Sequence, residues 1–255
     1  AFESYLFKDG KPMALTSLNK SDEAPFQYGH LSLKAILAVR DKRLAQTIDT
    51  VLLYNGRGFT RFNTGMESTS STGYGVAKYD NEAIPEGFRS QSGKNYTHAP
   101  LFWLSVIYLN YAEACAELGN ITQDDLDKSI NLLKDRAGLP HLNPIVGFSD
   151  PANNHGVSDL IWEIRRERRC ELMFDNDNRY WDLIRWHQLD KLDTTKYPDI
   201  ILGANVANDM DGCEANKVGK YIDGSKDGSR IYDKKHYLYP IPTGQIALNP
   251  QLAPQ

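Results

Sequence analysis

The stretch ERRCELMFDNDNRYWDLIRW, residues 167–186, decides the fold of this chain, and we call it the signature segment. Apolar residues recur at three- and four-residue steps from Leu160 to Met173, which predicts an amphipathic helix with one buried stripe. Residues 175–178, DNDN, then predict a turn, because short polar side chains compete for the backbone. A second amphipathic piece runs from Arg179 to Trp186. The sequence therefore predicts two helices joined by a polar turn.

The remaining positions of these two helices carry a dense run of arginines and carboxylates. A charge run on a helix is typical of a solvated face. Arginine forks also bind carboxylates bidentately and lock neighbouring segments together. The interleaved aromatics favour this second interpretation over active chemistry, since charged clusters are often structural. We expect a structural ion-pair network made of Glu167, Arg168, Arg169, Glu171, Arg179, Asp182 and Arg185.

Composition places the chain among ordinary globular proteins. Its 255 residues, 41% hydrophobic and 24% charged, allow one large domain or two small ones with a substantial core. The net charge of −4 argues against a dedicated nucleic-acid binder, which carries a basic footprint. No apolar run reaches the length of a membrane span. The opening AFESYLFKDG is neither a signal peptide nor a lipoprotein leader, which leaves a cytosolic protein and a mature or truncated product as alternatives.

A pair of helices is predicted ahead of the signature segment. Residues 101–118, LFWLSVIYLNYAEACAEL, form the clearest helical pattern, and Gly119 is its natural stop. A second helix is expected from Asp124 to Ala137, opened by a pair resembling a capping box, Thr122 and Asp125. Small residues at their contact predict an antiparallel hairpin of tetratricopeptide type. A single hairpin is not a repeat array, which needs about three units. Elsewhere we expect irregular loops and short strands at residues 50–54, 200–202 and 220–222, with a short helix or strand at 31–39.

Short motifs of catalytic or metal sites are missing from the sequence. The six histidines are scattered without a ligand spacing, and no G-x-S-x-G elbow is present. Gly56 and Gly58 lack the third glycine of a dinucleotide loop. Residues 209–212, DMDG, match only part of a calcium loop. Three cysteines without a C-x-x-C spacing indicate buried thiols rather than a disulfide framework. We expect no catalytic residue, no metal and no cofactor.

The signature segment resembles the pattern E-R-R-x-E-L-x-F-E-G-x-R-x-x-D-L-x-R-W of SusD/RagB proteins. Asp175 stands where that family has Glu, and one extra residue separates Phe174 from Arg179. Residues 237–252, which we call the closing segment, resemble the family's Y-P-I-P…E-I…N-P-x-L, with Gln245 in place of the acidic residue. Three shorter matches follow the family order: DKRL at 41–44, GY…KY at 73–79, and YAEA…RAGL between 111 and 139.

This resemblance implies that residues 1–255 are the C-terminal domain of a SusD-like protein. Such a domain is mainly α-helical, with tetratricopeptide-like hairpins packed with long irregular loops and a few short strands. The N-terminal half, with most tetratricopeptide helices and the lipid-anchoring cysteine, would lie outside this chain. The resemblance implies a non-catalytic lipoprotein on the outer-membrane surface of Bacteroidetes-type bacteria. It would capture oligosaccharides, or less often peptides, and deliver them to a SusC-like TonB-dependent β-barrel transporter.

A ligand needs aromatic walls and a few polar groups, and the glycine-rich stretch 55–75 supplies both. Flat aromatic faces stack on sugar rings, while Arg, Asn and Gln bond the hydroxyls. Alternatively these aromatics anchor their loops to the core, as scattered aromatics do. The candidate ligand-binding residues are Tyr54, Arg57, Phe59, Arg61, Phe62 and Tyr74, with Phe26 and Tyr28 from an earlier loop.

The sequence leaves two functions of other classes open. A glycan hydrolase would use paired carboxylates, which the fold brings together without any local motif. A helical-repeat scaffold would bind protein partners independently of any small molecule.

Overall fold

The computed structural model of this protein describes residues 2–18, 33–52, 70, 72–79, 81, 83–89, 91–98, 100–175, 178–205, 217–218, 221–224 and 228–252. The described chain divides into two compact units. The first comprises residues 1–179 and 202–224, and the second residues 180–201 and 225–255. The described part of the chain is mainly helical with two small antiparallel sheets, as the sequence predicted.

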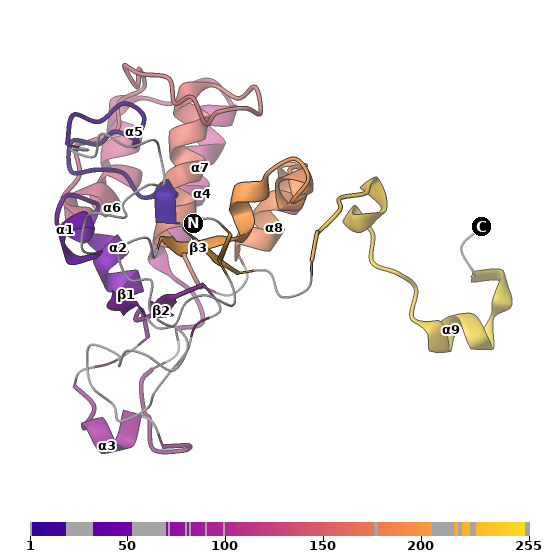
Figure 1. The fold of residues 1–255 in the computed structure, drawn as a ribbon. Helices are drawn as coiled ribbons and strands as arrows, with labels where there is room; N and C mark the ends of the chain where they lie inside the picture. The colour runs from indigo at the N-terminus through magenta and orange to yellow at the C-terminus, as the bar shows by residue number, and fades with distance from the viewer. Residues whose placement is uncertain are drawn as a thin grey trace. The chain divides into compact units, whose positions relative to one another are not determined.

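Helices carry most of the regular structure (Figure 1). The 3-10 helices are Phe2–Ser4, Leu189–Leu192, Pro198–Ile201, Lys234–Tyr237 and Pro250–Leu252. The α-helices are α1 (Leu33–Ala38), α2 (Lys42–Thr47), α3 (Glu86–Arg89), α4 (Leu104–Glu117), α5 (Gln123–Asp127), α6 (Ile130–Ala137), α7 (Asp159–Glu171), α8 (Asn178–Arg185) and α9 (Thr243–Leu248).

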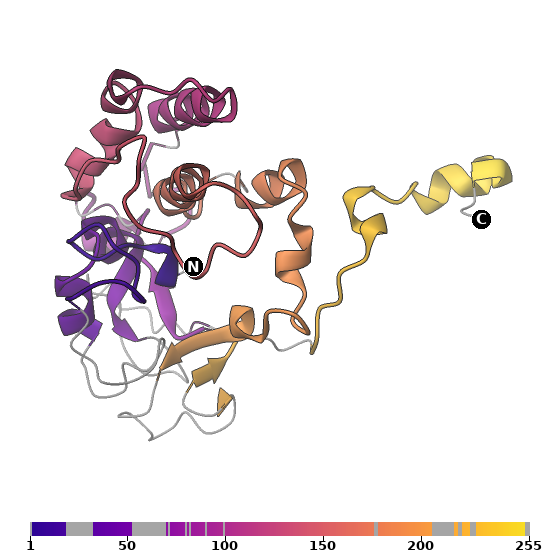
Figure 2. The same cartoon turned by 90° about the horizontal axis from the view of Figure 1, so that it is seen from above.

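Helix α7 is the central element of the first unit. Ser158 caps its N-terminus, and the Ser158 hydroxyl accepts from the Ile161 backbone N–H at 3.2 Å. Helix α4 runs beside it, and α6 and α2 pack against it as well (Figure 1). Figure 2 shows the first unit from above. Its apolar stripe enters the main core, which contains Leu109, Ala112, Leu126, Ile130, Leu133, Leu142, Ile164 and Leu172.

A second cluster of buried residues lies on another side of α7. Helix α1, helix α2 and strand β1 bring Leu37, Leu44 and Ile48 against Tyr5 and Cys170. Because Cys170 belongs to α7, this one helix contributes to both cores. The first unit therefore depends on α7 being placed correctly between two layers of apolar side chains.

Two small antiparallel sheets complete the first unit. Strands β1 (Ile48–Leu52) and β2 (Tyr74–Val76) pair with each other, with Ile48 opposite Val76. Strands β3 (Leu202–Asn205), β4 (Lys217–Val218) and β5 (Tyr221–Asp223) form the other, in the order β3-β5-β4. Gly203 lets the segment before β2 approach closely, because a Cβ at this position would lie 2.4 Å from the Thr72 carbonyl oxygen.

The predicted helix over 124–137 is wrong as a single element. The pair of Thr122 and Asp125 does form a capping box and opens α5. That helix ends at Asp127, and α6 begins only at Ile130. Ser129 lies between them, and its hydroxyl donates to the Asp125 carbonyl oxygen. A serine hydroxyl that competes for backbone carbonyls breaks or bends a helix.

The second unit contains most of α8, the following 3-10 helices and the closing segment. The Leu189 backbone N–H donates to the Tyr237 hydroxyl at 3.1 Å, and the Thr194 N–H donates to the Arg230 carbonyl at 2.9 Å. Pro242 precedes α9 in an extended conformation. Residues 230–237 are therefore joined to residues 187–194 by hydrogen bonds and by a ring contact between His187 and Tyr237.

We expect Ile164→Ala to lower the free energy of unfolding by about 2–5 kcal/mol, because the side chain is fully buried in the main core and its removal leaves a cavity. Ile107→Ala is the matched control. That side chain is 60% exposed on α4, so its loss should change stability by roughly 0.5 kcal/mol or less. Urea unfolding followed by circular dichroism measures both, and equal losses would contradict this placement of the core.

Candidate functional site

The charged side chains of α7 leave the helix in several directions and meet different elements. Arg165 Nη2 lies 3.1 Å from Glu117 on α4, and Arg168 Nη1 donates to Asn110 of the same helix at 2.8 Å. Arg168 is buried and Arg169 is half-buried. The charged side chains of α7 therefore contact other elements of the first unit and do not form a solvated face.

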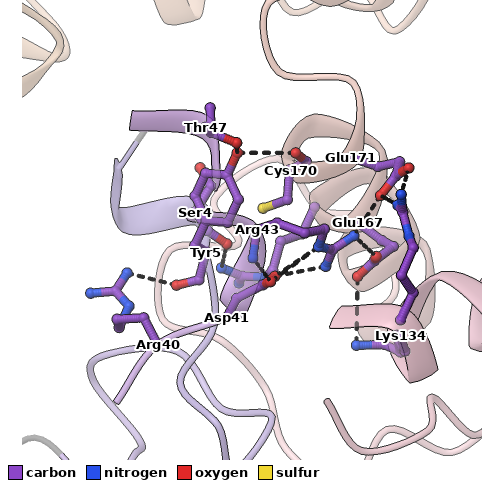
Figure 3. A network of polar contacts seen from close by, with 12 residues as sticks. Ser4, Tyr5, Arg40, Asp41, Arg43, Thr47, Lys134, Glu167, Cys170 and Glu171 are labelled. Atoms are coloured by element: carbon purple, nitrogen blue, oxygen red, sulfur yellow. Dashed lines mark hydrogen bonds and ion pairs between the residues drawn. The ribbon is translucent and has the colours of Figure 1, made fainter. Parts of the chain in front are cut away.

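The centre of the site is the buried guanidinium of Arg43 on α2. Asp41 caps that helix, and its carboxylate accepts from the Arg43 backbone N–H at 2.9 Å and from Nη2 at 2.7 Å. Nη1 donates to Glu167 and, at 3.0 Å, to Glu171 on α7. Figure 3 shows the guanidinium between these carboxylates. Two helices whose paired residues are 124 positions apart in sequence are thereby joined.

Helix α6 supplies two further cations. Lys134 Nζ lies 3.6 Å from Glu167 Oε2, and Arg136 donates to both Glu171 oxygens. Three carboxylates are thus met by three cations, of which Arg43 and Lys134 are buried and Arg136 is 61% exposed. Glu167 and Glu171 pair with cations of α2 and α6, whereas the sequence suggested partners among the arginines of the signature segment itself. We call these six residues the Arg43 network: Asp41, Arg43, Lys134, Arg136, Glu167 and Glu171.

Tyr5 and Cys170 lie beside the Arg43 network (Figure 3). The Tyr5 hydroxyl donates to the Cys170 carbonyl at 3.1 Å and lies 3.1 Å from Thr47 Oγ1. Arg40 Nη2 donates to the Tyr5 carbonyl at 2.6 Å. Burial raises the pKa of the Tyr5 hydroxyl and raises the pKa of the Cys170 thiol to about 12. Both groups therefore stay protonated at neutral pH, which removes Cys170 as a nucleophile.

Two glutamates of α7 have opposite pKa shifts. Burial acts to raise the pKa of Glu167, but the charges of Arg43 and Lys134 outweigh it and hold the pKa below its ordinary value. Burial is the stronger effect at Glu163, whose pKa is raised in spite of Arg166 and Lys134. Glu167 is therefore a permanent anion with matched partners, as a structural carboxylate should be.

Arg166 holds the loop that precedes α7. Its guanidinium donates to Asp150 in that loop and, through Nε at 3.0 Å, to Glu163. Trp162 Nε1 donates to the same Asp150 carboxylate at 3.0 Å. All three charged groups are buried. The loop before α7 is therefore fixed by one arginine with two carboxylate partners.

The turn at the end of α7 is held by Lys78 and Tyr79, which follow strand β2. Lys78 Nζ donates to the carbonyls of Glu171 and Met173 at 3.0 and 2.9 Å and to the Asp175 carboxylate at 2.7 Å. A cation that bonds the last carbonyls of a helix satisfies groups without intrahelical partners. The Tyr79 hydroxyl donates to the Phe174 carbonyl at 2.9 Å. Phe174 itself has φ 66°, an uncommon conformation for a residue other than glycine.

The predicted network members of α8 lie beyond this turn. Asp182 is buried, and its carboxylate accepts from Arg185 Nε at 2.9 Å. The Arg185 guanidinium lies 4.6 Å from the centroid of the Trp186 ring. Arg179 is half-buried. Asp182 and Arg185 therefore form an ion pair within α8 itself.

Most of the predicted ligand-binding residues lie outside the described residues. These are Tyr54, Arg57, Phe59, Arg61, Phe62, Phe26 and Tyr28. Tyr74 is described, on β2, where its ring stacks on Phe2 with centroids 5.1 Å apart and packs against the second core. A role for Tyr74 in ligand binding stays a prediction. The calcium-like stretch 209–212 is also outside the described part of the chain.

Sequence reasoning missed the partners that complete these networks. Asp150 and Lys134 carried no recognisable signal. Arg43, Lys78 and Arg136 did, because they belong to the short matches DKRL, GY…KY and RAGL. Each of these matches supplies a cation to Glu167, Glu171 or Asp175 in the signature segment. Treating the short matches as possible contact partners of the signature carboxylates would have found all three.

The described residues contain no group of three or more side chains suited to holding a metal ion. None of the helices in the same part of the chain combines the length and apolar character that crossing a bilayer requires. Cys115 and Cys170 are free thiols.

We expect Glu167→Gln to destabilise the fold by about 3–5 kcal/mol, because Arg43 and Lys134 would remain buried beside a neutral group. Glu117→Gln is the matched control: it breaks an ion pair whose carboxylate is 53% exposed, which should cost under about 1 kcal/mol. Chemical denaturation of both variants gives the comparison. Similar small losses in the two would show that the Arg43 network does not hold the fold.

The stabilising effect of Glu167 should depend on pH. Its pKa is lower in the folded protein than the ordinary value of 4.5, so its contribution is complete above that value and is lost as the pH falls through the lowered pKa. The difference in unfolding free energy between the wild type and Glu167→Gln should therefore be largest at neutral pH and shrink in acid. Urea titrations from pH 7 to pH 3 test this, and a constant difference would contradict it.

Comparison with known proteins gives one match. No curated protein and no solved structure is detectably similar to the chain. The family model described as SusD family matches residues 1–255, and so includes the Arg43 network, the turn held by Lys78 and the closing segment. This protein belongs to the SusD family.

Proposed function

We propose that this chain is a non-catalytic receptor that captures oligosaccharides and passes them to a SusC-like TonB-dependent transporter of the outer membrane. The observation that carries the proposal is the family match over residues 1–255. Members of the SusD family bind nutrients, glycans among them, at the cell surface, and they are generally binding proteins rather than enzymes. Membership of the family does not by itself identify the oligosaccharide ligand or the transporter, so these two parts are our proposal.

The carboxylates of α7 already have cationic partners, which supports a receptor rather than an enzyme. A catalytic carboxylate must be able to gain and lose a proton near the working pH. It must also be accessible to a substrate. Glu167 and Glu171 instead pair with cations from α2 and α6, and the pKa of Glu167 is held low. Glu163 has a raised pKa, but Arg166 Nε donates to both its oxygens and the side chain is buried. The charge-rich helix therefore stabilises the fold.

Membership of the family supports a placement at the outer membrane. SusD proteins are associated with the outer membrane. We propose that this protein is held there by a lipid anchor outside the present chain and acts over the mouth of a SusC-like β-barrel. Capture would give modest affinity, since a receptor that hands on its ligand must also release it.

Two other ligands or activities make different predictions. A peptide-binding member of the same family would bind peptides and leave glycans unbound. A glycan hydrolase would release shorter products, and replacing one Asp or Glu would abolish the release.

We expect isothermal titration calorimetry to detect binding of at least one glycan from a panel of maltoheptaose, cellohexaose, xylohexaose and laminarihexaose. The dissociation constant should fall roughly between micromolar and millimolar. Chromatography of the same samples after prolonged incubation should return the glycan intact. A casein hydrolysate serves as the peptide arm. Heat from the hydrolysate alone, no heat from any glycan, or shortened glycan products would each refute the proposed function.

A further inference from the structure

The loop before α7 (residues 147–157) is attached to that helix through a cluster of buried charges. Arg166 Nε donates to the two Glu163 oxygens at 3.2 and 3.0 Å, and Nη2 donates to Asp150 in the loop. Trp162 Nε1 donates to the same Asp150 carboxylate at 3.0 Å. The three charged side chains are buried, so one guanidinium serves two buried carboxylates. We call Asp150, Trp162, Glu163 and Arg166 the Arg166 cluster.

Asp150 orders the loop as well as attaching it. Its Oδ1 accepts from the Ala152 backbone N–H at 2.9 Å, and its carbonyl accepts from the Asn153 N–H at 2.9 Å. On another side, Arg166 Nη1 donates to the Ser4 carbonyl of the N-terminal 3-10 helix at 3.4 Å. A change of charge in the Arg166 cluster therefore acts on a segment that has ordered contacts of its own.

The groups that face Glu163 leave its negative charge incompletely matched. Lys134 of α6 is a second cation near Glu163, but its Nζ also lies 3.6 Å from Glu167 Oε2. Burial raises the pKa of Glu163, and Asp150 raises it further, against the charges of Arg166 and Lys134. Burial acts in the other direction on Arg166, but the charges of Glu163 and Asp150 raise the pKa of this guanidinium, so it stays charged. Glu163 is therefore the member of the Arg166 cluster that takes up a proton in weak acid.

We propose that the Arg166 cluster is a pH-sensitive switch for residues 147–157, in which a proton on Glu163 strengthens the attachment of Asp150 to Arg166. With Glu163 neutral, Arg166 has one anionic partner, and the repulsion between the two carboxylates is gone. Undocking of the loop would expose Glu163 to water and remove Asp150, so the proton would be released. By linkage, acid favours the docked loop and a rising pH loosens it. This inference does not depend on the ligand or on the transporter.

Hydrogen exchange followed by mass spectrometry measures the docking of the loop in the full chain at pH 5 and pH 8. After correction for intrinsic exchange rates, the amides of residues 150–157 should be protected roughly threefold or more better at pH 5. Glu163→Gln, which is neutral at every pH, should keep the stronger protection at both pH values. Glu117→Gln is the matched control and should behave like the wild type, because it removes a carboxylate that is 53% exposed and pairs with Arg165 of the same helix α7.

Urea unfolding tests the sign independently. A glutamate whose pKa is raised by folding lowers stability as the pH rises through the folded pKa, and costs nothing below its ordinary value of 4.5. The unfolding midpoint of Glu163→Gln, measured relative to the wild type, should therefore be higher at pH 8 than at pH 5. Glu167→Gln removes a carboxylate of lowered pKa and should show no such gain at pH 8.

The wild type alone can overturn the proposal, whether or not the variants fold. Equal corrected protection of residues 150–157 at pH 5 and pH 8 would do so. A pH response that persists unchanged in Glu163→Gln would assign the proton to another group and overturn it as well. A midpoint shift of Glu163→Gln that is the same at both pH values would contradict proton uptake by Glu163. Stronger protection in acid that Glu163→Gln makes independent of pH supports the switch.

Discussion

The first unit depends on one buried guanidinium. Arg43 is held by carboxylates of its own helix cap and of α7, so it fixes where α2 lies against the helix that serves both cores. Its position follows from local chemistry, because Asp41 both caps α2 and orients the side chain. Helix α6 reaches the same carboxylates through Lys134 and Arg136. Three helices are thus tied at one point by charge, and apolar packing fills the space around it.

Buried ion pairs of this kind contribute specificity more than net stability. Desolvation opposes the attraction between charges, and well-packed apolar residues often stabilise a core equally well. An apolar contact, however, tolerates a helix shifted along or rotated about its axis. A guanidinium shared by three carboxylates does not, since its donors are directional. The Arg43 network therefore permits one arrangement of α2, α6 and α7.

The sequence predicted the helices more completely than it predicted the contacts of the candidate site. Periodicity and end signals located α4, α7 and α8, and the capping box at Thr122 was correct. The break at Ser129 was missed because a side-chain hydrogen bond to the backbone outweighed a regular apolar pattern. The members of the Arg43 network from α2 and α6 lie far from the signature segment in sequence, so no local pattern pairs them. The contact between Trp181 and Tyr239 joins two motifs that are far apart in sequence, so no local pattern predicted it.

The attachment of Arg43 and Lys78 has a consequence for how such a protein diversifies. These residues flank residues 48–76, the two strands β1 and β2 with the chain between them, and both are bonded to α7 or to the turn that ends it. Once the two ends of a connection are fixed, doubling its length costs only about 0.6 kcal/mol in closure entropy. Insertions and deletions between the strands therefore leave the helical frame nearly undisturbed. Evolution can vary that connection in length and composition while the helices of the first unit keep their sequence.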